Sequence, residues 1–262
     1  MRVSTKKGMW GGQSPDTSGA AIRDRHTRRV PEPVVPTDQG ISPSPVRRAL
    51  DVAVAVTILV LIWPLFLLLA MATRLSTGGT AIYRQQRVGQ GGIAFTLYKF
   101  RTMRPTTGGP EVTAPGDDRV TRLGAIMRKT SLDELPQMVN VLLGHMTLVG
   151  PRPESVALAT RYPERLRFVF RYRPGVTGPC QVLVRDEKVL GWAVDVEKFY
   201  LTKLLPHRVE KDMDFLNDPT LARTVRWLVI TFLYLLHTAK PDLGPAQPEL
   251  AGATALSGPT DD

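Results

Sequence analysis

The segment "VAVAVTILVLIWPLFLLLAMA", residues 52–72, decides how the rest of the chain is read. It has 21 residues, carries no charge and has Thr57 as its one polar side chain. About 20 apolar residues in a helix are enough to cross the ~30 Å hydrocarbon layer of a bilayer. The sequence therefore predicts a membrane element.

Pro64 lies near the middle of this segment. Proline removes a backbone hydrogen bond and kinks or breaks a helix. Each arm of about 12 residues rises roughly 18 Å, too little to span alone. Basic residues flank the segment on both sides: Arg47 and Arg48 before it, and Arg74, Arg84 and Arg87 after it. A single crossing is oriented by an excess of basic residues on one side, and here there is little asymmetry. The pattern favours a re-entrant element that bends at Pro64 and returns to its own side.

Three other interpretations of residues 52–72 stay open: a single crossing, a buried core helix and a cleaved signal peptide. Ala70-Met71-Ala72 resembles a signal-peptidase site. The apolar segment is, however, longer than a usual signal core, and Pro64 divides it.

The composition points to anionic partners. The chain has 262 residues and a formal net charge of +10, which suits nucleic acid, phosphorylated small molecules or an acidic membrane surface. No nucleic-acid recognition motif accompanies the charge, so we expect no nucleic-acid partner. A single cysteine, Cys180, excludes an internal disulfide. Four scattered histidines argue against a zinc site.

The two ends of the chain differ from its middle. Residues 1–44 are rich in Gly, Pro, Ser, Thr and Arg, and residues 241–262 are similar but not basic. Both predict disordered tails. The remainder divides into a membrane element, residues 45–76, and one domain, residues 77–240.

A β-hairpin is predicted in "TAIYRQQRVGQGGIAFTLYKFRTM", residues 80–103. Ile93, Phe95 and Leu97 alternate with less apolar residues, which is strand periodicity. The glycines in "GQGG" supply a turn. No Gly-Lys-Ser/Thr follows them, so this is not a phosphate-binding loop.

Helices and a short strand follow. Residues 120–144 predict a helix with one apolar stripe, ended by Gly144; the stripe comprises Leu135, Met138, Val139, Leu142 and Leu143. Residues 146–150 are a strand candidate. Residues 225–237, "VRWLVITFLYLLH", predict an apolar helix too short to cross, which suits the membrane interface or a place against the re-entrant element.

Two adjacent carboxylates, Asp133 and Glu134, allow two interpretations. Ser131 with Glu134 fits a capping box. If the helix starts later, Pro136 instead lies in its first turn, where the backbone N–H has no partner within the helix. Asp133 and Glu134 then lie at the N-terminus of the helix, where anions bind. Neighbouring residues project differently, so one carboxylate could attack while the other holds a metal. Both interpretations stay open.

Many basic residues surround the pair, in a density typical of phosphate binding. Arg152 is singled out because its flanking prolines fix its backbone. The others are Lys99, Arg101, Arg119, Arg122, Arg128, Lys129 and Arg173.

Four blocks of sequence together resemble a known family. In chain order they are "RRALDVAVAVTILVLIWPLFLLLA", "YRQQRVGQGGIAFTLYKFRTM", "RVTRLGAIMRKTSLDELPQMVNVLLGHMTLVGPRPE" and "RYRPGVTGPCQV". They are similar to the bacterial monotopic phosphoglycosyl transferases, from about residue 46 to 185 and more loosely to 237.

The resemblance implies a reaction and a site. A sugar phosphate would pass from a UDP-sugar to polyprenyl phosphate, releasing UMP. Asp133 would be the nucleophile that forms an acyl-phosphate intermediate, and Glu134 would be its partner associated with Mg²⁺, so that Glu134 and Asp133 are the candidate metal residues. Lys99, Arg128 and Arg152 would hold phosphates and nucleotide.

The resemblance also implies a fold and a location. The fold would be α+β and mostly helical, with a re-entrant membrane helix hairpin broken at Pro64 and a small cytoplasmic domain containing a β-hairpin and interfacial amphipathic helices. The enzyme would act at the cytoplasmic face of the bacterial inner membrane, among anionic inner-leaflet lipids, and a homodimer is allowed. The alternatives are a non-catalytic membrane-anchored scaffold and a protein that binds phosphorylated ligands without chemistry.

Overall fold

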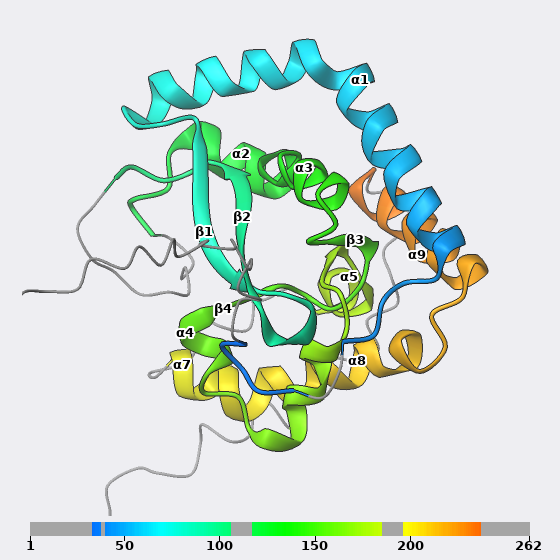
Figure 1. Cartoon of the computed structure of the whole chain (residues 1–262). Coiled ribbons are helices and arrows are strands. Elements are labelled where there is room, and N and C mark those ends of the chain that lie inside the picture. Colours follow the sequence, from blue (N-terminus) through cyan, green and yellow to red (C-terminus); the bar gives the residue numbers. More distant parts are fainter. Residues whose placement is uncertain (1–32, 38–39, 106–116, 185–195, 237–262) are drawn as a thin grey trace, which may run out of the picture. The chain divides into compact units, whose positions relative to one another are not determined.

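A computed structural model of the chain describes residues 33–37, 40–105, 117–184 and 196–236 (Figure 1). The predicted tail 241–262 and most of the predicted tail 1–44 lie outside these residues.

The apolar segment forms part of one long helix, α1 (Pro45–Thr77). Ser44 caps its start by accepting the Arg47 N–H, and Gly78 ends it in the left-handed conformation, with φ 68°. The helix continues through Pro64, and Figure 1 shows it bending where its colour turns from blue to cyan. The structure therefore contains one bent helix rather than two helices joined by a turn.

The predicted β-hairpin is confirmed. β1 (Ile82–Val88) pairs antiparallel with β2 (Ala94–Phe100), and the 3₁₀ turn Gln90–Gly92 joins them. Phe95 and Leu97 are buried, as their alternation predicts. The short strand β4 (Glu154–Ser155) pairs with the end of β1, which gives the sheet order β2-β1-β4.

Asn140 closes the other edge of β2. Its Oδ1 accepts the Tyr98 N–H at 3.0 Å and its Nδ2 donates to the Thr96 carbonyl at 2.7 Å. The buried amide thus occupies the place of a neighbouring strand and fixes its helix against the sheet.

The prediction of one helix over residues 120–144 is wrong. α2 (Arg122–Thr130), the 3₁₀ turn η2 (Leu132–Glu134) and α3 (Gln137–Leu142) take its place. Ser131 turns the chain with a φ of 58°, and Pro136 precedes α3, where its missing N–H costs no ladder bond.

The apolar stripe predicted for this segment is only partly right. Met138 is buried, but Val139 and Leu143 are 37% and 57% exposed. The break before α3 rotates the helix, so its buried face includes Gln137, Asn140 and Val141. The exposed apolar pair is left on the outside of the fold.

The predicted strand and the predicted C-terminal helix are confirmed. β3 (Thr147–Val149) pairs parallel with β5 (Gly175–Thr177), and α9 (Leu221–Leu235) contains the apolar run. The other elements are α4 (Val156–Ala159), η3 (Glu164–Arg171), α5 (Pro179–Leu183), α7 (Val196–Phe199), the π-helical turn η4 (Tyr200–Leu204) and α8 (Leu205–Asn217).

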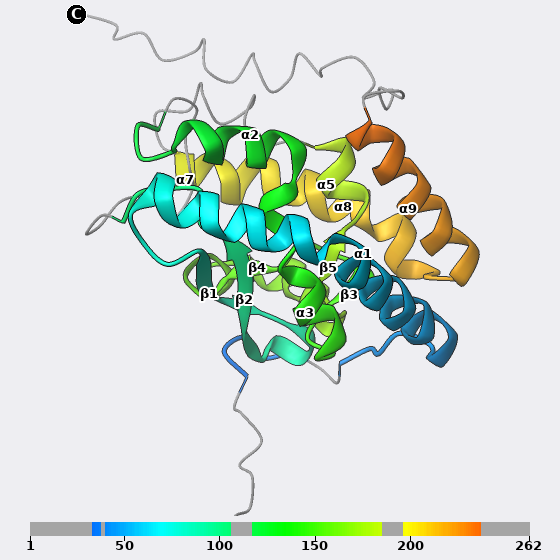
Figure 2. The same ribbon diagram turned by 90° about the horizontal axis from the view of Figure 1, so that it is seen from above.

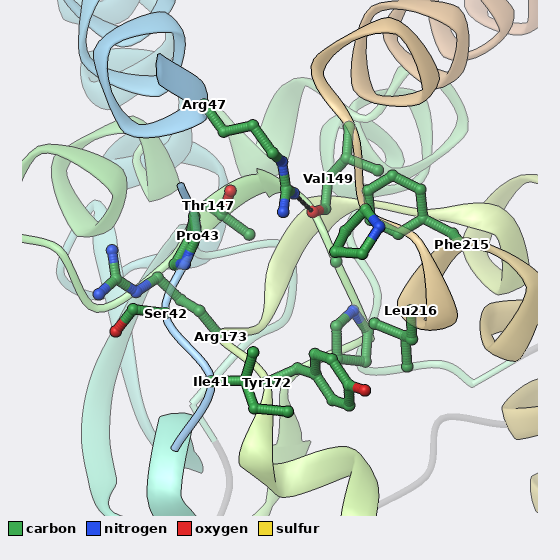
Figure 3. A pocket seen from close by; sticks show the side chains of 13 residues that line it. Ile41, Ser42, Pro43, Arg47, Thr147, Val149, Tyr172, Arg173, Phe215 and Leu216 are labelled. Carbon is green, nitrogen blue, oxygen red and sulfur yellow. Dashed lines mark hydrogen bonds between the residues drawn. The ribbon is translucent and has the colours of Figure 1, made fainter. Parts of the chain in front are cut away.

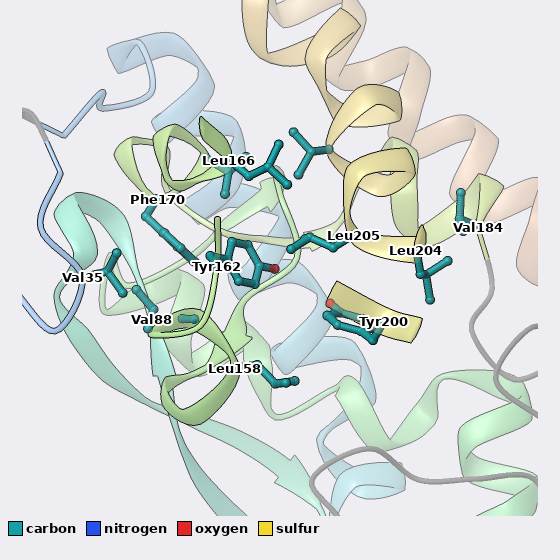
Figure 4. Packing of buried hydrophobic residues seen from close by; sticks show 13 residues of the cluster. Val35, Val88, Leu158, Tyr162, Leu166, Phe170, Val184, Tyr200, Leu204 and Leu205 are labelled. Carbon is teal, nitrogen blue, oxygen red and sulfur yellow. The ribbon is translucent and has the colours of Figure 1, made fainter. Parts of the chain in front are cut away.

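A hydrophobic cluster packs η3, η4 and α8 together (Figure 4). Val35 belongs to it and is 1% exposed, and the Val34 N–H donates to the Gly92 carbonyl at 2.9 Å. Any side chain at Gly92 would collide with the Val35 carbonyl. The predicted disordered tail 1–44 includes residues 33–37, but the structure shows that these residues pack against the domain. The sequence does not reveal this contact, because a single buried valine within a polar segment is too weak a signal.

Both ends of α1 are fixed to the same domain. Near its start, Arg47 donates to the Val149 carbonyl at 3.1 Å, and Asp51 accepts the Leu148 N–H at 2.9 Å. Near its end, Leu69 packs in a cluster with Phe100 and Met127. Between these anchors one face lies over α2 and α3, while much of the outer face is exposed (Figure 2).

The sequence interpretation of Arg47 and Arg48 as simple flanking charges is corrected by these contacts. Arg47 is buried, and Arg48 donates to the carbonyls of Val141 and Leu142 at 2.6 and 3.0 Å. A cation at the end of α3 also complements the helix dipole. Both arginines therefore serve to join α1 to the domain.

Candidate active site

Asp133 and Glu134 lie on η2, under the second arm of α1. The residues on either side of the pair, Leu132 and Leu135, join the hydrophobic cluster that contains Leu69 of α1. Asp133 itself is 8% exposed. Apolar contacts thus hold the two carboxylates next to the helix that carries the membrane-type sequence.

The turn at Ser131 decides between the two interpretations of the pair. The Ser131 side chain makes no capping hydrogen bond, and its backbone N–H donates to the Arg128 carbonyl at 3.3 Å. The capping-box interpretation is therefore wrong. Instead α3 starts after Pro136, as the second interpretation required, and the carboxylates precede it.

Lys99 is the direct partner of Glu134. Its Nζ lies 2.7 Å from Glu134 Oε1, and the two side chains are 20% and 25% exposed. Lys99 comes from the end of β2, directly before the buried Phe100. The structure thus brings together two residues that lie 35 positions apart.

Arg128 reaches the site from the last turn of α2. Its Nε donates to Thr102 Oγ1 at 2.8 Å, and its charge acts on Asp133. Gly124 makes this approach possible, because a Cβ there would lie 2.1 Å from the Thr102 carbonyl oxygen. The contact between helix and strand end therefore sets where Arg128 lies.

Arg152 follows β3 and lies close enough to Glu134 for its charge to act on that carboxylate. Its charge lowers the pKa of Glu134. The Pro151 carbonyl before it accepts the Gly175 N–H at 2.9 Å. Gly150 and Gly175 allow this close packing, because a Cβ on Gly175 would lie 2.1 Å from the Gly150 nitrogen.

The two carboxylates have different electrostatic surroundings. Burial raises the pKa of Asp133 to about 6; Glu134 adds to the rise, while Lys99 and Arg128 oppose it. Burial also disfavours the Glu134 carboxylate, but Lys99 and Arg152 outweigh it and lower that pKa. The pair thus combines a carboxylate whose ionised form is favoured, Glu134, with one whose pKa is raised to about 6, Asp133.

The residues present fit a magnesium ion shared with substrate. Within the described residues no group of three or more histidine, cysteine, aspartate or glutamate side chains could hold a metal by itself. Mg²⁺ in phosphate-transfer sites commonly uses one or two carboxylates and completes its shell with phosphates and water. Asp133 and Glu134 supply two such groups.

A pocket elsewhere contains none of the predicted site residues. It lies at the start of α1 and is lined by Arg47, Tyr172, Arg173 and Phe215 among others (Figure 3). Arg173, one of the basic residues that the sequence analysis groups around the carboxylates, lines this pocket, and its Nε donates to Gln90 Oε1 at 3.1 Å. Arg173 therefore lies near the start of α1 and is not among the residues that the structure brings together around Asp133 and Glu134.

Sequence reasoning missed two further residues next to the site. Arg87 was counted as a flanking charge, yet its charge acts on Glu134. Glu154 is not among the predicted site residues, although it is buried and its Oε1 lies 3.6 Å from Arg87 Nη1. The signal that could have found them is the "PRPE" block, in which Glu154 follows the proline-flanked arginine.

The model of the family described as bacterial sugar transferase matches residues 42–238. The chain belongs to the bacterial sugar transferase family. The match includes α1, the hairpin, the carboxylate turn and α9.

The names of the relatives of this sugar transferase refer to different sugars. A UDP-glucose:undecaprenyl-phosphate glucose-1-phosphate transferase of Caulobacter vibrioides is 41% identical over 73% of this chain and 70% of its own length. A protein of the same name from Escherichia coli is 37% identical over 66% of this chain. A UDP-N-acetylgalactosamine-undecaprenyl-phosphate N-acetylgalactosaminephosphotransferase of Aeromonas hydrophila is 34% identical over 73%. The matches cover 36% and 44% of the last two relatives.

Proposed function

We propose that this chain is a membrane-bound phosphoglycosyl transferase. It moves a sugar 1-phosphate from a UDP-sugar to polyprenyl phosphate of the undecaprenyl type and releases UMP. The family membership and the names of the relatives support the reaction class. The observation that carries the assignment of the site is the buried Asp133, flanked by Glu134, Lys99 and Arg128 directly under α1.

In the first displacement, a carboxylate oxygen of Asp133 attacks the phosphorus that bears the sugar. The bond between this phosphorus and the bridging oxygen breaks, and UMP leaves with the electron pair. Asp133 then carries the sugar phosphate as an acyl phosphate. Lys99, Arg128 and Arg152 stabilise the phosphate oxygens while negative charge moves to UMP. Bound Mg²⁺ would neutralise further phosphate charge.

In the second displacement, an oxygen of polyprenyl phosphate attacks the same phosphorus. The acyl–phosphate bond breaks, and Asp133 regains its carboxylate. The product is a polyprenyl diphosphate sugar, and no net proton is taken up when all phosphates stay ionised. Two displacements allow the two bulky substrates to use one site in turn.

The two anchored ends of α1 support a re-entrant membrane arrangement. A helix of 33 residues is about 50 Å long if straight, yet both its arms rest on one domain. In this proposal α1 enters the inner leaflet, bends near Pro64 and returns, so that the domain stays on the cytoplasmic face. Exposed apolar residues of α3 and α9 face the same interface; they are Val139, Leu143, Val225, Val229, Phe232 and Leu236.

This arrangement delivers the lipid substrate to the carboxylates. Leu132 and Leu135 contact the cluster that includes Phe66 and Leu69 of α1. A polyprenyl tail can therefore remain in the bilayer while its phosphate reaches Asp133.

The test uses membranes that contain the chain, undecaprenyl phosphate and a panel of UDP-sugars that includes UDP-glucose and UDP-N-acetylgalactosamine. We expect UMP release with at least one donor, and its loss in Asp133→Asn and Asp133→Ala. A donor labelled in the sugar phosphate should leave a hydroxylamine-sensitive label on wild-type protein. Active protein that never acquires this label would exclude the covalent route, and inactivity with every donor would favour a scaffold.

A further inference from the structure

Glu154 is a buried carboxylate outside the proposed reaction. Its Oε2 accepts the hydroxyl of Tyr162 at 2.9 Å and the hydroxyl of Tyr200, and its Oε1 lies 3.6 Å from Arg87 Nη1. Arg208 donates in turn to the Tyr200 hydroxyl at 2.9 Å. Burying so many polar groups is costly unless each is bonded, and such networks commonly fix one geometry.

Arg87 connects this network to the site. Its Nε and Nη2 donate to Gln85 Oε1 at 3.1 and 2.7 Å, and its Nη1 donates to the Pro153 carbonyl at 3.2 Å. The guanidinium is thus held by Gln85 and Glu154. A planar group with fixed donors is well suited to holding a carbonyl in place.

The carbonyls of Pro151 and Pro153, the two neighbours of Arg152 in sequence, both accept hydrogen bonds. The Pro151 carbonyl accepts the backbone N–H of Gly175, and the Pro153 carbonyl accepts Arg87. The first donor belongs to the backbone and the second to a side chain. The peptide group before Arg152 is thus fixed by a backbone donor, and the peptide group after Pro153 is fixed by Arg87, a residue that can be changed.

We infer that Arg87 is a positioning residue that sets the direction of Arg152, with Glu154 and its two tyrosines orienting Arg87. In this inference Arg87 affects nucleotide binding through Arg152, in addition to the effect of its charge on Glu134. The inference rests on the proposed function, in which Arg152 binds the phosphates of the nucleotide.

The chain offers a matched control in Arg84. It lies on the same strand, three residues away, and is exposed. Arg84→Gln and Arg87→Gln each remove one positive charge from β1, so both variants lose long-range attraction for a nucleotide. A difference between them reports the contacts of Arg87.

The experiment measures UMP affinity by calorimetry on purified protein, because UMP is common to every UDP-sugar. We expect Arg87→Gln to weaken UMP binding about tenfold and Arg87→Lys about threefold, with Arg84→Gln within about twofold of wild type. Glu154→Gln, which keeps the shape but loses the charge, should weaken binding about threefold. If Arg87→Gln does not fold, Arg87→Lys and Glu154→Gln decide the same question.

A double-mutant cycle separates positioning from independent binding. If Arg87 acts through Arg152, adding Arg87→Gln to Arg152→Gln should weaken UMP binding by less than about twofold. Fully additive losses, or an Arg87→Gln protein that equals Arg84→Gln, would overturn the inference. Wild-type protein that neither binds UMP nor releases it from any donor would instead count against the proposed function.

Discussion

Lys99 Nζ and Glu134 Oε1 lie 2.7 Å apart, and this ion pair joins the end of β2 to the carboxylate turn. The same charge also opposes the rise that burial causes in the pKa of Asp133, the preceding residue. Because one lysine serves both carboxylates, its loss should affect binding and chemistry together.

Lys99→Met should reduce UMP release at least a hundredfold, because it removes a cation from phosphate oxygens that gain charge in the transition state. Lys99→Arg keeps the charge and should retain more activity than Lys99→Met. The measurement is the initial rate of UMP release with the best donor of the panel. Equal rates of UMP release by wild type and Lys99→Met would show that Lys99 has no role in the reaction.

The covalent labelling of Asp133 should depend on pH. In the proposed mechanism the carboxylate form of Asp133 attacks phosphorus, and burial raises its pKa to about 6. The rate of label formation should therefore be constant above about pH 7 and fall about tenfold per pH unit well below 6. Arg128→Gln should move this midpoint upward, since Arg128 lowers the pKa of Asp133. A midpoint near 4 in the wild type would contradict the burial argument.

Asp133→Asn should stabilise the fold while it abolishes activity. A folded-state pKa of about 6 lies above the unfolded value of 3.8, so the stability that Asp133 contributes at low pH is lost as pH rises through 6. The substitution should raise the free energy of unfolding on the order of 2 kcal/mol at pH 8 and much less at pH 4.

Thermal unfolding at the two pH values measures this effect of Asp133→Asn. Asp118→Asn is the control, because Asp118 is exposed and a surface change of this kind stays within about 0.5 kcal/mol. A loss of stability in Asp133→Asn at pH 8 would show that ionised Asp133 is favoured in the fold.

The path of α1 can be tested with cysteines at both ends. Ser42 and Thr80 are exposed and lie just outside the helix, and Leu61 is exposed in its middle. Ser42→Cys and Thr80→Cys should both react with an impermeant maleimide in inside-out vesicles and neither in intact spheroplasts. Leu61→Cys should react in neither preparation, because lipid covers it.

The native Cys180 serves as the background for this experiment. It is buried, and burial raises the pKa of its thiol, so wild-type protein should stay unlabelled. Labelling of Ser42→Cys and Thr80→Cys from opposite sides would establish a crossing and refute the re-entrant path.

The sequence by itself determined the features that depend on local pattern. The apolar run of α1, the alternation in β2 and the glycines of the hairpin turn each predict their element, because periodicity and turn chemistry act over a few residues. The adjacent carboxylates and the proline-flanked arginine were visible in the same way, and the family resemblance added roles for them.

Only the tertiary structure decided which of these residues meet. The approach of Arg128 depends on Gly124 lying against the Thr102 carbonyl, and nothing near Gly124 in sequence indicates that contact. The break at Ser131, the burial of Arg47 and the link from Arg87 to Pro153 likewise arise from packing between distant segments. Local pattern fixes each element, but the position of a charge relative to Asp133 is set by long-range contacts that carry no periodic signal in the sequence.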